Sequence, residues 1–507
     1  MVDAALKCHG PTQIPSFVTI IPNGSETGRY LAVDLGGTNC RVCLVHLHGQ
    51  GTYTMKQKKH VVPHDVRVNP SYRPLFAFIA ERIRDFLAEH ADVDADPRNQ
   101  ATLKLGFTFS FTYISHSLSQ GTMVQWDKGW DIPNALGRDP CQMLQEAMDS
   151  LSLPVRVTAL TNDSVGTLMS RAYTSPFPSA TLLGAIFGTG TNAAYVERMD
   201  NISKLDTTSE SMHRSKDGVM VVNTEWGALC DSPQSFLRAC RYDDALDSAS
   251  SNPTKQLLEK QISGLYLGEL MRLAIVSLLE ADLLAMSVPE DSPVFYPYAI
   301  DTSFLSRVLA HSSEELELAV QEISTTLQAE NVSTKDANAI QMIAMAISKR
   351  SARLSGAAIA AIILQSGRIK KKTSDNLCIS KTSSVPIVVE DEIVVPLTQP
   401  KETVPDRWVR LKSFVSAVFF CFKQHTYSQP LPPPEKSTTL LVDEKNKEHD
   451  VIDVGVDGSL YEFCPNFEIY LREALRDVPA IGTTGEARIR IGLAKDGSSV
   501  GAALVAV

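Results

Sequence analysis

A short segment near the start of the chain combines glycine with an acidic residue in a way that could bind phosphate and its metal ion. The segment is DLGGT, residues 34–38, which follows an apolar run. Glycine lets the backbone approach an anion closely and turn its N–H groups toward phosphate oxygens, and the carboxylate of Asp34 could face the accompanying metal. The alternative is that Gly36 and Gly37 only form a tight hairpin turn.

A related pattern recurs in the second part of the chain. GTGTN, residues 188–192, again lies between two apolar runs. Alone it is equally consistent with a polar turn that binds nothing. Two such hairpins, however, could hold a phosphate chain from both sides, whereas unrelated turns have no reason to share this chemistry. The pair therefore indicates binding of nucleotide phosphates.

A carboxylate that could remove a proton from an acceptor hydroxyl lies in TNDSVGTL, residues 161–168. A hydroxyl that attacks phosphorus must lose its proton at or near the transition state, and Asp163 could accept it. Asn162 and Asp163 at the end of an apolar run are also typical of a helix N-cap or an Asx turn. Capping and catalysis are compatible.

Recognition of an acceptor that carries several hydroxyls would require planar or bidentate polar groups. Glu225 in NTEWGAL and Glu259 in LEKQISGLYLGEL could supply them, together with Asn192 and Lys128. Each of these residues, taken alone, is also consistent with a solvated surface position.

The elements that must position these residues follow from the hydrophobic pattern. Residues 30–48 and 181–198 each show an apolar strand, a glycine-rich turn and a second strand, which predicts two hairpins in an internally duplicated chain. Helical spacing predicts a helix over 75–91. Residues 451–463 are expected to form a strand, a glycine turn and a strand, and Gly497 opens a final helix. The alternation indicates an α/β fold with sheets between helices.

Composition limits the class of protein. At 507 residues, 44% hydrophobic and 21% charged, the chain is an ordinary globular protein of two or three lobes, for which a cleft is expected. A net charge of −10 argues against broad nucleic-acid binding. Nine cysteines without metal-type spacing favour the reducing cytoplasm. The first residues do not resemble a secretory signal, and the longest apolar runs, 414–422 and 357–364, are too short to cross a membrane.

Together these segments resemble the hexokinase family, and within it the fungal glucokinases. Further motifs that carry the resemblance are IPSFV (14–18), LGFTFSF (105–111), WDKGW (126–130), GAIFGTGTNAAYVE (184–197), SARLSGAAIAAI (351–362), GVDGSLYEFCPNFE (455–468) and KDGSSVGAAL (495–504). The resemblance implies phosphorylation of glucose, and of other hexoses in some members, at the 6-hydroxyl by ATP with Mg²⁺, the first step of glycolysis.

The resemblance also implies a role for individual residues. Asp163 is expected to be the catalytic base. The sugar ligands are expected to be Ser110, Lys128, Asn162, Asn192, Glu225 and Glu259. The first phosphate site would comprise Asp34, Gly36, Gly37, Thr38, Asn39 and Arg41, the second Gly188, Thr189, Gly190 and Thr191, and the adenosine border Gly455 and Ser459. No direct protein ligand to the metal is assigned, although Asp34 could reach it through water.

The fold implied is the two-lobed, actin-like ATPase and sugar-kinase fold, an α/β fold of duplicated ribonuclease-H-like domains around a cleft. The small lobe is expected to span 24–161 with the helix 497–507 returning to it. The large lobe is expected to span 162–496 with residues 1–23, and it is interrupted at 369–448 by a charged, Ser/Thr- and Pro-rich insertion that we expect to be disordered in part. This segment is either a tolerated surface insertion or non-coding sequence retained in the gene model.

Departures from the family pattern support an alternative function. Thr112 and Ser115 replace a proline and a glutamine of the sugar loop, Asp127 replaces a threonine beside Lys128, and the helix before IPSFV is absent or shortened. The alternative is a hexokinase-like regulatory or sugar-sensing protein with impaired catalysis. The retained base, sugar ligands and phosphate hairpins favour the enzyme.

Overall fold

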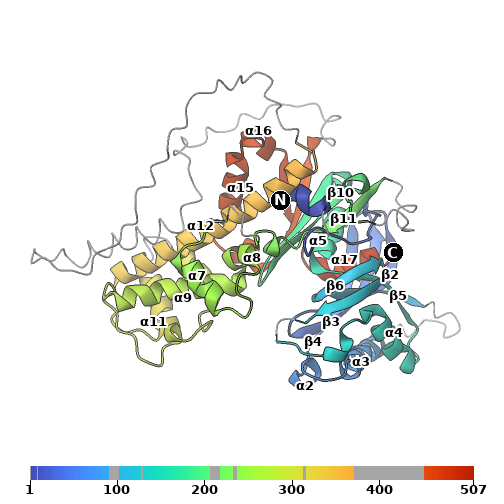
Figure 1. Cartoon of the computed structure of the whole chain (residues 1–507), viewed down its shortest axis with the longest axis horizontal. Helices are drawn as coiled ribbons and strands as arrows, with labels where there is room; N and C mark the ends of the chain where they lie inside the picture. Colours follow the sequence, from blue (N-terminus) through green and yellow to red (C-terminus); the bar gives the residue numbers. More distant parts are fainter. Residues whose placement is uncertain are drawn as a thin grey trace, which may run out of the picture.

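The computed structural model describes residues 2–7, 10–90, 102–126, 129–205, 217–231, 237–311, 316–369 and 450–507. Two large sheets form the framework of this part of the chain, and a helical block extends from the second sheet (Figure 1). The candidate insertion 369–448 lies, apart from Ile369, outside the described residues, as do Asp127 and Lys128.

The first sheet has the strand order β4-β3-β2-β5-β8. Its strands are β2 (Thr27–Leu35), β3 (Asn39–Gly49), β4 (Thr52–Val61), β5 (Leu103–Phe109) and β8 (Val155–Thr161). The first three strands are antiparallel, whereas β5 and β8 run parallel to β2. Helices α3 (Arg73–Glu89) and α4 (Pro140–Ser150) cover one face around a core that includes Phe76, Phe86 and Phe107. The short α2 (His64–Arg67) precedes α3, and a hairpin of β6 (Thr112–Ser117) and β7 (Gln120–Gln125) lies beside α4.

The second sheet repeats this arrangement. Its order is β1-β11-β10-β9-β12-β13, and its strands are β1 (Ile14–Pro15), β9 (Thr181–Phe187), β10 (Thr191–Arg198), β11 (Val219–Asn223), β12 (Ile452–Asp457) and β13 (Ile489–Leu493). From β11 to β13 it has the same sequence of two antiparallel and two parallel pairings as the first sheet. Both predicted hairpins and the internal duplication are therefore confirmed.

One predicted strand is wrong. Residues Ser459–Phe463 form the short helix α14 and not a strand that returns after the glycine turn. The reason is topological, because β12 runs parallel to both of its neighbours, so the chain must leave the sheet and cross over before it can form β13. Helices α15 (Phe467–Asp477) and α16 (Gly482–Glu486) complete this crossover.

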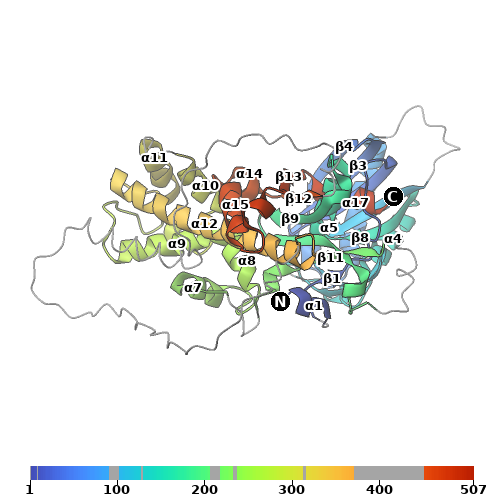
Figure 2. The same cartoon turned by 90° about the horizontal axis from the view of Figure 1, so that it is seen from above.

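Two helices lie between the sheets and bring them together (Figure 2). They are α5 (Asp163–Thr174), which packs on the second sheet, and the predicted C-terminal helix α17 (Gly497–Val505), which packs on the first. Gly166 and Gly501 allow this contact, since a Cβ on Gly501 would lie 2.0 Å from the carbonyl oxygen of Gly166. Because α5 contacts elements of both halves, the lobe boundaries given above stay a prediction.

A helical block covers the other face of the second sheet. Its helices are α1 (Val2–Lys7), α7 (Arg241–Ala249), α8 (Leu257–Ile262), α9 (Gly264–Glu280), α10 (Thr302–Ala310), α11 (Leu316–Leu327) and α12 (Thr334–Gln365). The long helix α12 starts at a capping box formed by Ser333 and Asp336 and packs closely against α15 at Gly356. The six-residue α1 precedes IPSFV. No helix among the described residues is long and apolar enough to cross a membrane.

Candidate active site

The first glycine turn lies at the edge of the first sheet where three parallel strands end. The N–H of Gly36 donates to the carbonyl of Asn39 at 3.0 Å, and the indole Nε1 of Trp130 donates to the carbonyl of Gly37 at 2.6 Å. Asp34 accepts a hydrogen bond from Ser498 Oγ of α17 at 2.9 Å. The turn is therefore fixed from both sides by residues distant in the sequence.

Other predicted residues of the first phosphate site lie beside this turn. The amide of Asn39 donates to Thr38 Oγ1 at 2.7 Å, and Arg41 lies 3.4 Å from a carboxylate oxygen of Asp496 at the start of α17. Ser110 directly follows β5, and its N–H donates to the carbonyl of Leu35 at 3.2 Å. The structure thus brings the first predicted phosphate segment and one predicted sugar ligand to the same sheet edge.

The second glycine turn is held by the start of α9. The N–H groups of Gly264 and Leu265 donate to the carbonyls of Gly188 at 2.8 Å and Thr189 at 3.0 Å. The turn is closed by a bond from the N–H of Gly188 to the carbonyl of Gly190 at 3.0 Å. Thr191, the last predicted phosphate residue, accepts a hydrogen bond from the indole of Trp226 at 3.0 Å.

The predicted adenosine border lies against this second turn. Gly455 is in β12 and Ser459 starts α14. Between them, Gly458 has a φ of +116°, and a Cβ there would lie 2.4 Å from the carbonyl carbon of Phe187. Only glycine fits this approach of two backbones, which explains the residue type in the GVDGS motif.

The candidate base lies at the N-terminus of α5. Asn162 is the N-cap, and its Oδ1 accepts from the N–H of Val165 at 3.0 Å and from Ser164 Oγ at 3.2 Å. Asp163 Oδ1 accepts from the N–H of Ser164 at 2.8 Å. The capping interpretation is thus confirmed for Asn162, and the helix dipole favours the negative charge of Asp163 in the first turn.

Three side chains near this helix form a closed hydrogen-bonded group, which we call the Asn–Glu triangle: Asn192, Asn223 and Glu225. Asn192 Nδ2 donates to Asn223 Oδ1 and to Glu225 Oε1, both at 2.9 Å, and Asn223 Nδ2 donates to the same Oε1 at 2.8 Å. Asn223 Oδ1 also accepts a hydrogen bond from Ser164 Oγ at 3.4 Å. The triangle is therefore linked to the residue that follows Asp163.

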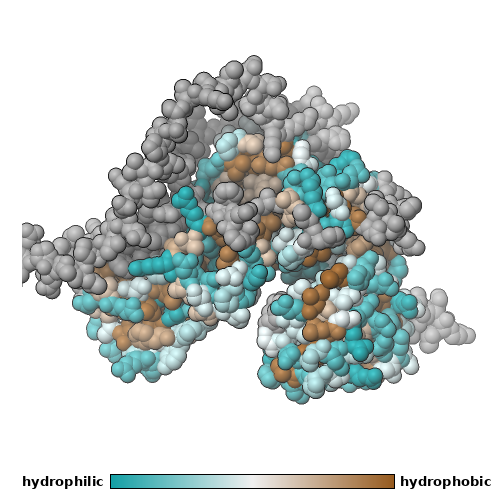
Figure 3. Space-filling model, in the orientation of Figure 1, coloured by the Kyte–Doolittle hydropathy of each residue, from teal (hydrophilic) through white to brown (hydrophobic). Residues whose placement is uncertain are grey.

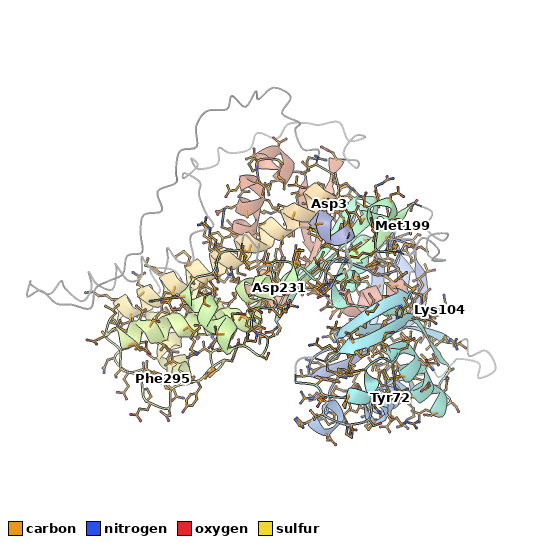
Figure 4. The ribbon with its side chains drawn as sticks, viewed as in Figure 1. Asp3, Tyr72, Lys104, Met199, Asp231 and Phe295 are labelled. Carbon is orange, nitrogen blue, oxygen red and sulfur yellow. The ribbon has the colours of Figure 1, made fainter. Side chains whose placement is uncertain are left out.

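Glu259, another predicted sugar ligand, lies in the first turn of α8. The first N–H groups of this segment, of Gln256 and Leu257, donate to the carboxylate of Asp231, both at 2.9 Å. Glu259 lies close to the turn that follows Glu225 and to the second glycine turn, since a Cβ on Gly227 would be 2.8 Å from its Oε2 and one on Gly190 3.4 Å from its Oε1. In Figure 4 Asp231 lies where the helical block meets the second sheet.

One further carboxylate, that of Asp457, lies at the end of β12 beside the second glycine turn. Burial raises the pKa of Asp457, and the charges of Asp496 and Asp163 raise it further. Burial likewise raises the pKa of Tyr113 in β6, with contributions from Cys141, Glu225 and Asp163. Charged groups of both halves thus influence one another across the region between the sheets, and Figure 3 shows a deep hollow between the helical block and the lobe of the first sheet.

Some functional candidates were missing from the sequence-based set, and others lie outside the described residues. Asn223 and Asp231 were not predicted, and Asp457 was included only as part of the GVDGS segment expected beside the adenosine. Asn223 and Asp457 share a recognisable pattern, a polar residue at the end of a buried strand. Lys128 and Asp127 are outside the described residues. Of the altered sugar-loop residues, Thr112 pairs with Gln125 in the β6–β7 hairpin.

Comparison with known proteins identifies the family. Hexokinase family profiles match residues 2–173 and residues 182–390 with 415–507. The chain belongs to the hexokinase family. A glucokinase of Aspergillus niger is 39% identical over 98% of this chain and 88% of its own length, and hexokinase-2 of Schizosaccharomyces pombe is 34% identical over 97% and 87%. The solved hexokinase of Schistosoma mansoni, complexed with glucose, superposes with a TM-score of 0.69 at 29% identity, covering 97% of this chain and 88% of that one.

Membership of the hexokinase family makes this chain a hexose kinase that uses ATP, and the two-lobed sugar-kinase fold is confirmed. The observed strand orders agree with it, because both halves share one topology. Among the described residues there is no group of three or more His, Cys, Asp or Glu side chains placed to hold a metal ion.

Proposed function

We propose that this hexokinase-family protein transfers the terminal phosphoryl group of ATP to the 6-hydroxyl of glucose, giving glucose 6-phosphate and ADP. The observation that supports this most is the link between a carboxylate at a helix N-terminus and a set of sugar-type ligands. Asp163 starts α5, and the adjacent Ser164 contacts Asn223 of the Asn–Glu triangle. A base and hydroxyl ligands joined in this way are suited to an acceptor that carries several hydroxyls.

In the proposed reaction the bond between the γ-phosphorus and its bridging oxygen breaks while a bond from that phosphorus to O6 of glucose forms. The proton of the 6-hydroxyl passes to the carboxylate of Asp163, and the bridging oxygen leaves with ADP. The triangle, Glu259, Ser110 and Lys128 would orient the sugar, and Asn162 would both cap α5 and face it. Holding acceptor and donor in line can lower the barrier by about 7–11 kcal/mol, so positioning is the main task of these residues.

The two glycine turns are proposed to bind the phosphates of ATP from opposite sides. Asp34, Asn39 and Arg41 with the 36–38 turn would contact one side, and Gly188 to Thr191 the other, with Gly455 and Ser459 beside the adenosine. The carboxylates of Asp34 and Asp457 are a donor set that suits Mg²⁺ carried by the nucleotide, with Asp34 reaching it through water. Bound there, Mg²⁺ would neutralise phosphate charge.

A deoxy sugar tests the acceptor position. Purified protein with Mg-ATP should produce ADP with glucose but, with 6-deoxyglucose, only at the rate seen without sugar. The deoxy sugar should still raise the melting temperature and inhibit the reaction with glucose, since only the reacting hydroxyl is missing. Phosphorylation of 6-deoxyglucose at the rate of glucose would contradict the proposal. ADP formation with mannose and fructose in the same assay defines the range of hexoses that the protein phosphorylates. We propose that the reaction takes place in the cytosol.

A further inference from the structure

Asn223 bonds to both other members of the Asn–Glu triangle and also reaches α5. Its Oδ1 lies 2.9 Å from Asn192 Nδ2 and 3.4 Å from Ser164 Oγ, while its Nδ2 lies 2.8 Å from Glu225 Oε1. An asparagine can accept at one atom and donate at the other in this way, whereas aspartate only accepts and alanine does neither. The position thus requires an amide.

The orientation of the neighbouring amide is set independently. Asn192 Oδ1 accepts from the N–H of Ala193 at 2.8 Å and from Thr224 Oγ1 at 3.2 Å. Its Nδ2 must therefore point to the acceptors, which are Asn223 Oδ1 and Glu225 Oε1. The direction of each hydrogen bond in the triangle follows from this without ambiguity.

Glu225 needs such support because its backbone is unusual. Its φ is +45° and its ψ 44°, a left-handed conformation that is strained for a residue with a side chain and persists only where the surroundings hold it. Two amide donors converge on its Oε1, from Asn192 and from Asn223. These two hydrogen bonds hold the carboxylate of Glu225 in place. The backbone of Glu225 lies just after β11, outside any regular strand or helix that could fix it.

We propose that Asn223 is a positioning residue for the sugar: it orients the carboxylate of Glu225 and the amide of Asn192, and through Ser164 it ties them to the helix that carries Asp163. This inference rests on the proposed function. Asn223 does not itself contact the reacting atoms in this account. Its loss should therefore weaken the binding of the sugar more than it slows the chemical step.

Three variants separate a positioning role from a merely structural one. Asn223→Asp is isosteric, keeps the acceptor atom and loses the donor to Glu225, while Asn223→Ala loses both. The matched control is Asn201→Asp, because Asn201 Nδ2 donates to the carboxylate Oε1 of Glu197 at 2.8 Å at the opposite end of β10. The chemistry of the exchange is the same, but the control site is remote from the triangle.

The expected result is a split between the kinetic constants. Both Asn223 variants should raise the KM for glucose on the order of tenfold or more, as expected for loss of a hydrogen bond to a charged group. Both kcat and the KM for ATP should change by less than about threefold. Asn201→Asp should match the wild type. Asn223 variants whose KM for glucose equals that of the control, or both of which fail to fold, would overturn the proposal.

The pH profile gives a second reading. In Asn223→Asp two carboxyl groups face each other, with Asp163 of α5, Tyr113 of β6 and Glu259 of α8 as the other titratable groups nearby. At lower pH the pair can share one proton, which restores a donor. The KM defect of Asn223→Asp should therefore shrink from pH 8 to pH 6, while that of Asn223→Ala should not. A defect that is equal in the two variants at every pH would count against a positioning role.

The wild type in the same experiment distinguishes the two levels of the account. Wild-type protein that produces ADP with glucose, beside Asn223 variants that behave as the control does, would remove this inference and leave the proposed function intact. Wild-type protein that shows no glucose-dependent ADP formation would overturn the proposed function, and the positioning role of Asn223 with it.

Discussion

The contact between α5 and α17 can be tested with a single methyl group at Gly501. An ideal Cβ at this position would lie 2.0 Å from the carbonyl oxygen and 2.2 Å from the Cα of Gly166. Nonbonded carbon atoms are comfortable at about 3.5–4.0 Å, so Gly501→Ala requires the two helices to separate by more than about 1 Å. Both clashing atoms belong to backbone, which cannot move aside alone.

The magnitude follows from two opposing terms. Replacing glycine by alanine inside a helix stabilises it by about 1 kcal/mol. Overpacking at a tight contact costs about 1–3 kcal/mol and sometimes more, and the short Gly501 distances place this site at the upper end. We expect a net destabilisation of about 1–2 kcal/mol and a melting temperature lower by a few degrees. Because Asp163 begins α5, a shift of about 1 Å should also lower kcat, by up to about 100-fold.

The assay is thermal unfolding of the protein without ligands, followed by glucose-dependent ADP formation. Gly10→Ala is the control, since no atom lies within 4 Å of a Cβ there. It should change neither the melting temperature nor kcat. A Gly501→Ala variant that melts higher than the wild type and retains its kcat would show that helix propensity dominates and that the two helices are not in the close contact described.

Further predictions concern charged groups. Arg171 and Asp453 form a buried ion pair, so Arg171→Met should lower the free energy of unfolding by about 3–5 kcal/mol in a urea titration, and adding Asp453→Leu should restore part of the loss; no recovery would contradict this. Burial raises the pKa of Asp457, so the folded state binds that proton more tightly and loses stability as pH rises through the folded pKa. Asp457→Asn should therefore raise the melting temperature at pH 7, with the gain vanishing below about pH 3.8, and a lower melting temperature at pH 7 would refute it. Asp231→Ala should raise the KM for glucose about tenfold in initial-rate assays, because α8 and Glu259 lose two charge-assisted hydrogen bonds, and an unchanged KM would exclude this support.

Local patterns were sufficient to predict the parts of the fold that depend on near neighbours. Alternating apolar runs around a glycine pair predict the β2–β3 and β9–β10 hairpins, and Asn162 predicts its own capping of α5. The error at Ser459–Phe463 has the opposite origin, because the choice between helix and strand there depends on the parallel pairing of β12 with β9 and β13. No residue within that segment encodes this pairing.

In the candidate site, too, the sequence predicted features that depend on local motifs and missed those that depend on contacts between distant residues. Asp163, Asn192, Glu225 and Glu259 were selected by residue type and motif, and the structure places them around α5, β10, β11 and α8. Their roles as base and sugar ligands stay predictions. Asn223 was missed because two of its partners, Asn192 and Ser164, are 31 and 59 residues away along the chain. Its only local signal is its place at the end of the buried run VMVV, the kind of position that drew attention to Asp34 and Asp163.

The most direct test of the central claim is ADP formation by the purified full-length protein with Mg-ATP and glucose, beside an Asp163→Ala variant and a reaction without sugar. The account predicts that glucose stimulates ADP formation in the wild type and that the variant, while still folded and still stabilised by glucose, loses this stimulation. Equal glucose-dependent turnover in the variant would contradict the role of Asp163 as the base. A folded wild-type protein that binds glucose without turnover would contradict the proposed reaction.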